Sequence, residues 1–210
     1  METSAAAVGA TRGGRGARER ILRAAVALFV GDGIHATGIA KLAEVAHVST
    51  RTLYQHFPSK EALVSAYLRR IESDPAILGE TVLERHDLSA RERLLRLFAE
   101  RPAGSPSATV VRGCPLHNAA VESAGTLPEA SAAVERHKRE LIARLIETAA
   151  EAGARRPEAL GRQLAVLFEG ARALSTSLND MRPFDEAEEL AQTLIKGATG
   201  NDQPSSSKSS

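Results

Sequence analysis

Apolar residues recur every three or four positions along most of the chain, which is the period of an α-helix that buries one face. Within residues 17–31, for example, Ile21, Ala25 and Leu28 fall on one face. We find no convincing strand pattern and no internal repeat. Glycines, prolines and capping serines divide the pattern. They predict an all-α chain of about nine helices, over residues 17–31, 38–46, 50–56, 60–71, 90–101, 115–123, 128–152, 157–179 and 183–198.

The two ends and one internal stretch lack this pattern. Residues 1–16 are mainly small residues and Arg, and residues 199–210 are polar and low in complexity. Neither end carries enough apolar surface to offset its ordering entropy, so we expect both to be disordered. The Pro-, Gly- and Ser-rich residues 102–113 predict a mobile loop.

Composition narrows the class of protein. A chain of 210 residues, 43% of them hydrophobic, is long enough for a buried core. The single cysteine excludes an intramolecular disulfide and a metal site built mainly on thiolates. No apolar run approaches the roughly 18 residues that a membrane helix needs, and the N-terminus lacks the apolar core of a signal peptide. We therefore expect a cytoplasmic protein with no membrane partner.

The net charge of +1 hides an asymmetry. Residues 1–70 hold ten Lys or Arg against five Asp or Glu, a balance of +5. The remainder holds 17 against 21, a balance of −4. A basic segment of this size is suited to a polyanion such as nucleic acid. A chance fluctuation of a few charges is the alternative interpretation.

Residues 38–56 have the layout of a helix-turn-helix, with an interruption at residues 47–49 between two short helices. Ser49 is a suitable N-cap for the second helix. This helix exposes Thr50, Arg51 and Gln55, whose side chains suit thymine methyls and the edges of guanine and adenine. The alternative is an ordinary helix pair with a solvated polar face.

The residues themselves resemble a known family. Val48-Ser49, Thr52-Leu53-Tyr54, His56-Phe57 and Ser59-Lys60-Glu61 before Leu63 stand in one register. This stretch closely resembles the N-terminal DNA-binding domain of the TetR family of bacterial transcriptional repressors. The resemblance implies four parts: a disordered basic arm (1–16), a three-helix helix-turn-helix domain (17–62), a helical ligand-binding and dimerisation domain (63–198) and a disordered tail (199–210).

The resemblance also implies which residues face double-stranded DNA. We expect Thr50, Arg51 and Gln55 to contact bases, and residues such as Tyr54 and Lys60 to contact phosphates. Arg12 and Arg15 of the arm could enter a minor groove, although an unengaged arm is the favoured alternative. The full predicted set is Thr37, Lys41, Ser49, Thr50, Arg51, Thr52, Tyr54, Gln55, His56 and Lys60.

Three positions depart from the family pattern. His47 stands where the turn usually has glycine, so a left-handed backbone there would cost free energy. Arg51 stands where glycine or alanine is common, so the operator sequence cannot be borrowed from relatives. Gly38 replaces a threonine or serine, which leaves capping of that helix to Thr37.

In this family the C-terminal helices form a ligand pocket, and the last two long helices form a dimer. The apolar positions of residues 157–179 follow a heptad that suits a four-helix bundle with a second subunit. The alternative is a core within one chain. The predicted dimer residues are Leu160, Leu164, Leu167, Ala171, Leu174, Leu178, Leu190 and Leu194.

The predicted pocket is lined mainly by aliphatic side chains, because the chain has five Phe, two Tyr and no Trp. Such a lining favours an apolar or flat ligand. The candidate lining residues are Leu94, Leu97, Phe98, Cys114, Leu116, His117, Asn118, Leu141, Leu145 and Phe168.

The segment around Cys114 resembles a Gly-Cys-Pro segment found in a subset of TetR-like proteins. Cys114 could be a redox switch, a metal ligand with His117, or part of a haem-sensing dipeptide with Pro115. We favour a small buried residue at a helix start. We assign no metal site, and no cofactor beyond an unidentified small-molecule effector.

The sequence therefore predicts a ligand-responsive homodimeric repressor that a small molecule releases from a palindromic operator. The alternative is a dimeric helical binding or interaction protein without operator binding. We expect no enzyme, because no Ser-His-Asp set, phosphate loop or paired carboxylates support catalysis. The ligand, the operator and the controlled genes do not follow from the sequence.

Overall fold

The computed structural model describes residues 11–99, 113–122 and 128–200. These residues form ten α-helices and one 3₁₀ helix, with no strand among them, which confirms the predicted all-α class. The chain divides into two compact units, residues 1–77 with 114–136 and residues 78–113 with 137–210. No helix in the described ranges is long and apolar enough to cross a membrane.

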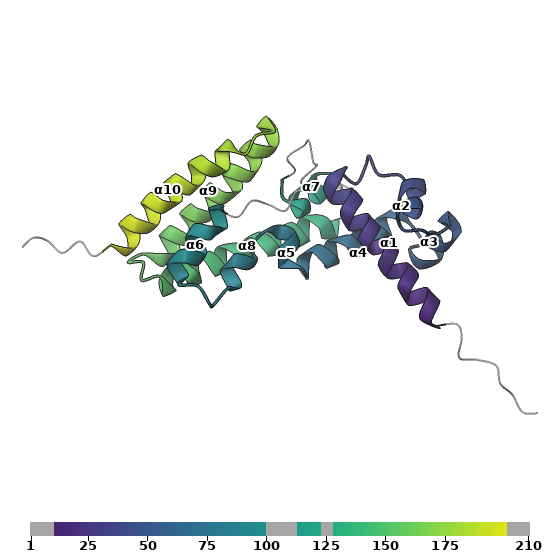
Figure 1. Cartoon of the computed structure of the whole chain (residues 1–210), viewed down its shortest axis with the longest axis horizontal. Helices are drawn as coiled ribbons and strands as arrows, with labels where there is room; N and C mark the ends of the chain where they lie inside the picture. The colour runs from purple at the N-terminus through teal and green to yellow at the C-terminus, as the bar shows by residue number, and fades with distance from the viewer. Residues whose placement is uncertain (1–10, 100–112, 123–127, 201–210) are drawn as a thin grey trace, which may run out of the picture. The chain divides into compact units, whose positions relative to one another are not determined.

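The first unit contains a helix-turn-helix (Figure 1). Helices α2, α3 and α4 pack against α1, and α7 packs against α4. The rings of Tyr67 and Phe29 meet edge to face, with centroids 5.1 Å apart, and this contact joins α4 to α1. The elements are α1 (Thr11–Gly31), α2 (Ile39–Val45), α3 (Thr50–His56), α4 (Lys60–Glu72), α7 (Pro115–Glu122) and the start of α8 (Pro128–Glu151).

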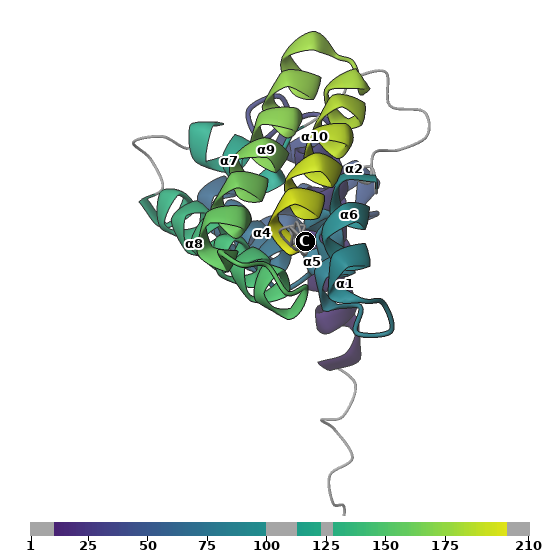
Figure 2. The same ribbon diagram turned by 90° about the vertical axis from the view of Figure 1, so that its left-hand side faces the viewer.

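The second unit is a helical bundle in which α10 packs against both α9 and α6. Figures 1 and 2 show α9 and α10 side by side. Phe168 lies at the centre of the core and meets Phe98 and Phe184 edge-on, with ring centroids 5.8 and 6.1 Å apart. The elements are η1 (Thr81–Glu84), α6 (Ala90–Ala99), the remainder of α8, α9 (Pro157–Leu178) and α10 (Arg182–Thr199).

Three details of the predicted helices need correction. Residues 11–16 were expected to be disordered, but they belong to α1, because each residue added to an existing helix gains a backbone hydrogen bond. Helix α5 (Pro75–Leu78) and η1 were not predicted, since four-residue segments show no apolar period. Thr199, expected in the disordered tail, is the last residue of α10. The predicted disorder of residues 1–10 and 201–210 and the predicted loop at 102–112 lie outside the described residues.

The predicted dimer seam on α9 is partly wrong. Leu160, Leu164 and Ala171 are at most 3% exposed and belong to the core of their own unit. The buried face of α9 is broader than a heptad seam and also contains Ala165 and Phe168. The predicted seam runs along one edge of this face, so its members divide between the core and the surface.

Helices α8 and α9 make a close backbone contact at Gly161. A β-carbon at position 161 would lie 2.7 Å from the α-carbon of Ile146, which is shorter than any real contact of this kind. Only glycine fits there without displacing a helix. The contact therefore fixes the distance between α8 and α9 at this level.

A buried carboxylate holds the chain at the start of the second unit. Glu80 is fully buried, and its oxygens lie 3.2 Å from Nε2 of His137 and 2.5 Å from an Nη of Arg144. Arg172 of α9 lies 3.4 Å from the same carboxylate and also donates to the carbonyl of Leu78. This arrangement joins residues 78–80 to α8 and α9.

Burial alone would raise the pKa of Glu80. The hydrogen bond and charge of His137, with the charges of Arg172 and Arg144, outweigh it and leave the pKa below the ordinary value of 4.5. A lowered folded pKa means that the ionised group stabilises the fold above its unfolded pKa. This stabilisation is lost as the pH falls through the folded value.

We therefore predict that Glu80→Gln lowers the free energy of unfolding by about 3 kcal/mol at pH 7, because it leaves buried cations without a countercharge. The difference from the wild type should shrink as the pH falls below 4.5, the ordinary carboxyl pKa. Urea unfolding between pH 3 and pH 7 measures it. Glu147→Gln, at an exposed position on α8, is the matched control. A difference that grows with acid would contradict the prediction.

Candidate DNA-binding site

The turn between α2 and α3 closes by a defined set of hydrogen bonds. The N–H of His47 donates to the carbonyl of Glu44 at 3.0 Å, and that of Val48 donates to the carbonyl of Ala43 at 2.9 Å. This pair of bonds is a Schellman motif, which needs a left-handed residue directly after the helix cap. His47 is that residue, with φ of +52°, so the backbone cost expected for a non-glycine residue applies.

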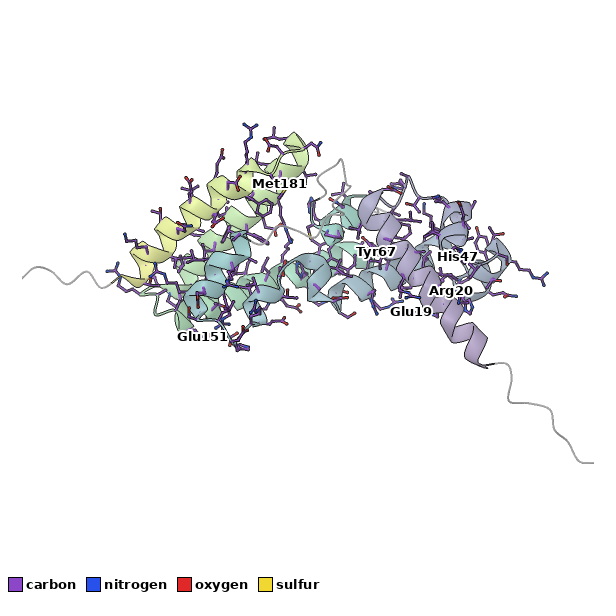
Figure 3. All side chains as sticks on the ribbon, viewed as in Figure 1. Glu19, Arg20, His47, Tyr67, Glu151 and Met181 are labelled. Atoms are coloured by element: carbon purple, nitrogen blue, oxygen red, sulfur yellow. The ribbon has the colours of Figure 1, made fainter. Side chains whose placement is uncertain are left out.

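An arginine from α1 completes the turn. Nε of Arg20 donates to the carbonyl of Ala46, the C-cap of α2, at 3.1 Å. Figure 3 labels Arg20 and His47 in the first unit. A second arginine, Arg18, lies over the ring of Phe57 at 4.9 Å. The helical period of residues 17–31 gives no signal for these positioning roles.

Helix α3 is capped at its start and anchored by its inward face. Oγ of Ser49 accepts a 3.0 Å hydrogen bond from the N–H of Thr52, as the sequence predicted for an N-cap. The Thr52 hydroxyl lies 2.8 Å from the same oxygen. Leu53 and Phe57 are at most 3% exposed. These constraints leave the opposite face of α3 open to solvent.

Most of the predicted DNA-facing residues lie on the surface of the first unit. No hydrogen bond or ion pair to Arg51 occurs among the described residues, whereas Nζ of Lys41 lies 3.4 Å from Glu44. The residues divide into exposed ones (Lys41, Ser49, Thr50, Arg51, Tyr54, Gln55) and half-buried ones (Thr52, His56, Lys60).

The expectations for Thr37 are wrong. Its side chain is 2% exposed, and its hydroxyl donates to the carbonyl of Gly33 at 2.7 Å. It neither faces outward nor caps α2, whose N-cap is Gly38 with no side-chain hydrogen bond. The small polar side chain satisfies a backbone carbonyl in the loop before α2 instead. The side chains of Arg12 and Arg15 lie outside the described residues.

Helix α4 begins shortly after α3 in the sequence. Oγ of Ser59 caps it by accepting from the N–H of Ala62 at 3.2 Å. Hydrogen bonds from the Glu61 backbone and then from Ser59 lower the pKa of the exposed Glu61 carboxyl. An ionised glutamate on this first turn suits the positive end of the helix dipole.

The predicted pocket residues divide between the two units. In the first unit Cys114 and Leu116 are buried, whereas His117 is exposed and Asn118 half-buried. The other six belong to the hydrophobic core of the second unit: Leu94, Leu97, Phe98, Leu141, Leu145 and Phe168. The pocket therefore remains a prediction.

Cys114 has no disulfide partner and is 4% exposed. Its burial fits the interpretation of a small residue at a helix start. No group of three or more His, Cys, Asp or Glu side chains in the described part of the chain could hold a metal ion.

Comparisons with known proteins cover both units. Residues 21–67 match bacterial regulatory proteins of the tetR family, and residues 90–191 match the tetracyclin repressor-like C-terminal domain. A solved structure of a proposed TetR-type transcriptional regulator from Streptomyces avermitilis is 30% identical over 87% of this chain and 97% of its own, with a TM-score of 0.62. The chain belongs to the TetR family. The predicted family is thus confirmed.

Other similar transcriptional regulators match this chain over different lengths. The structure of a TetR-family regulator from Streptomyces coelicolor is 26% identical over 88% of this chain and 97% of its own, with a TM-score of 0.73. The regulator RutR of Escherichia coli is 46% identical over 54 residues, 26% of each chain. The repressor KstR2 of Rhodococcus jostii is 38% identical over 64 residues, 30% of this chain and 31% of KstR2. This chain thus spans only about a quarter to a third of these two curated relatives.

The left-handed His47 allows a direct test of the turn between α2 and α3 in this TetR-family chain. We predict that His47→Gly raises the free energy of unfolding by about 1 kcal/mol, because glycine adopts a positive φ without steric cost. Urea unfolding followed by circular dichroism measures the change.

His86→Gly is the matched control. His86 is exposed, and its φ does not lie in the left-handed region. Glycine should give no gain there, because it only adds flexibility to the unfolded chain. An equal gain at both positions, or none at position 47, would contradict the prediction.

Proposed function

We propose that this TetR-family chain is a homodimeric repressor that binds a palindromic operator and leaves it when a small molecule binds. The exposed face of α3 carries the proposal. Thr50, Arg51 and Gln55 stand on a helix that is capped at Ser49 and anchored by two buried side chains, so they are presented on a rigid support. Rigid presentation lowers the entropic cost of binding.

The side chains on this face suit the major groove. Arg51 can donate two hydrogen bonds to guanine, and Gln55 can pair with adenine. Tyr54, His56 and Lys60 carry donors suited to phosphate oxygens. The net charge of +5 over residues 1–70 is modest, so tight binding at physiological salt should require the DNA-binding units of two subunits together.

Apolar residues on α9 and α10 support the homodimer. Val166, Leu174 and Leu178 of α9 are 74%, 53% and 62% exposed, and Leu190 of α10 is 55% exposed. A groove of about 440 Å³ lies on the same face, lined by Arg162, Gln163, Val166, Leu167, Leu190 and Leu194. Exposed leucines in such a cluster favour burial against another surface. A second copy would bury both faces across a two-fold axis.

The effector is proposed to be a small apolar molecule bound by the second unit. Its core is aliphatic and aromatic, and the buried charges around Glu80 are paired with one another. A paired network leaves little need for a charged ligand. Repression is the simpler regulatory proposal, because occupying an operator is sufficient to block transcription, whereas activation needs a further contact. FasR of Mycolicibacterium smegmatis, 40% identical over 77 residues, 37% of this chain and 35% of FasR, is named an activator.

Gel shifts with the DNA upstream of the chain's own gene test operator binding. We predict that Arg51→Ala relaxes base preference at one position of each half-site, at a cost of about 1–3 kcal/mol for the preferred base. Lys60→Ala should weaken binding to all sequences alike. It should also reduce the salt slope, the steepness with which the logarithm of the binding constant falls with the logarithm of salt concentration, by about one per subunit.

Arg91→Ala, an exposed arginine of α6, is the control for lost positive charge. It should leave base preference and salt slope unchanged. A wild-type chain that shows no sequence-dependent shift would instead favour the alternative, a dimeric binding protein without operator binding.

We predict that Leu190→Asp converts the dimer to a monomer, because it places a charge in the apolar face. Analytical ultracentrifugation at micromolar concentration measures the mass. Val121→Asp is the matched control, since Val121 is 63% exposed on α7, away from α9 and α10 in the sequence. If both variants stay dimeric, or both dissociate, this face is not the dimer interface.

A further inference from the structure

The last residue of α7 contacts the loop that leads into the helix-turn-helix. Oε2 of Glu122 accepts a 2.8 Å hydrogen bond from the backbone N–H of His35. Nε2 of His35 donates to the backbone carbonyl of Glu122, with 2.5 Å between the two atoms. The residues are 87 positions apart in sequence, so both bonds are tertiary contacts. We name this pair of bonds the His35–Glu122 latch.

A glycine makes room for the latch. A β-carbon at Gly33 would lie 3.0 Å from Oε1 of Glu122 and 3.3 Å from Oε2, so the carboxylate occupies the space that any other side chain would need. Gly33 also has φ of +95°, and its N–H donates to the carbonyl of Phe29 at 3.2 Å. Gly33, two residues after the end of α1, thus admits the carboxylate from α7.

Helix α7 is itself held on α4. Leu116 and Ala119 are at most 1% exposed, and α7 packs against α4. Burial raises the pKa of Tyr67 of α4, and the charges of Cys114 and Glu122 raise it further. Figure 3 labels Tyr67 in the first unit. A helix seated in this way can hold the carboxylate in place.

The loop between α1 and α2 determines where α2 begins. Its internal bond runs from the hydroxyl of Thr37 to the carbonyl of Gly33. The N-cap Gly38 gives α2 no side-chain hydrogen bond. A seven-residue helix whose start lacks a side-chain cap has little stability of its own. The direction of α2, and through the Schellman turn that of α3, therefore depends on the loop that the latch holds.

We propose that Glu122 is a positioning residue for operator binding, which fixes α2 and α3 through the His35–Glu122 latch. This inference rests on the proposed operator binding. Both His35 and Glu122 belong to the first unit, so the latch acts within that unit.

The test compares four full-length chains: wild type, Glu122→Ala, Glu122→Gln and Glu140→Ala. Glu140 is an exposed glutamate of α8, and its removal makes the same change in charge. Amide hydrogen exchange is measured for residues 33–45, and affinity is measured for a DNA sequence selected from a random pool by the wild type and for an unrelated duplex.

In Glu122→Ala the amide of His35 should exchange about tenfold faster, because it loses a charge-assisted hydrogen bond. Affinity for the selected DNA should fall about tenfold, because fewer protein molecules hold α2 and α3 in the binding-competent arrangement. Affinity for the unrelated duplex should change less than twofold. Glu122→Gln should retain most of the His35 protection and most of the affinity for the selected DNA, since its amide oxygen can still accept the hydrogen bond. Glu140→Ala should bind DNA as well as the wild type or better, because a lost negative charge favours a polyanion.

Two results would overturn the proposal. One is unchanged protection of His35 and of α2 in Glu122→Ala. The other is a lower melting temperature with unchanged affinity of the folded protein for the selected DNA, which would make the latch a stabilising contact only. If the wild type selects no sequence, operator binding fails, and hydrogen exchange still decides whether the latch holds α2.

Discussion

The ends of two seven-residue helices are the constraint on which the DNA-binding unit depends. A helix this short is unstable alone, and its terminal N–H and C=O groups have no partners within it. In α2 and α3 other residues supply those partners: a Schellman turn, the Arg20 guanidinium and the Ser49 hydroxyl. Two buried side chains, Leu53 and Phe57, then attach the pair to α1. The exposed face of α3 is oriented by contacts that lie entirely outside that face.

Local signals in the sequence predicted the features that depend on near neighbours. The helix period and the Ser49 cap follow from spacing and residue type. The prediction for Thr37 was wrong because a threonine before a helix suits a cap. Only the fold shows that its hydroxyl donates to the carbonyl of Gly33 instead. The α9 seam was partly wrong for a related reason. A heptad identifies one stripe of a helix, but the neighbouring helices decide which stripe is buried.

Long-range polar contacts were beyond prediction from the sequence. Glu80 and Arg172 are separated by 92 positions, and His35 and Glu122 by 87, with no spacing rule to connect them. The two pairs also differ in setting. The first pair is buried and satisfied within the second unit, whereas the second lies near the surface of the first unit. Both pairs nevertheless join elements that lie far apart in the sequence.

The glycine contact between α8 and α9 has a mechanical consequence. A β-carbon at position 161 would meet both the α-carbon of Ile146, at 2.7 Å, and its Cγ1, at 2.6 Å. A larger residue there would therefore have to push α8 away from α9. That separation would open the core that Leu141 and Leu145 of α8 share with Phe168 of α9.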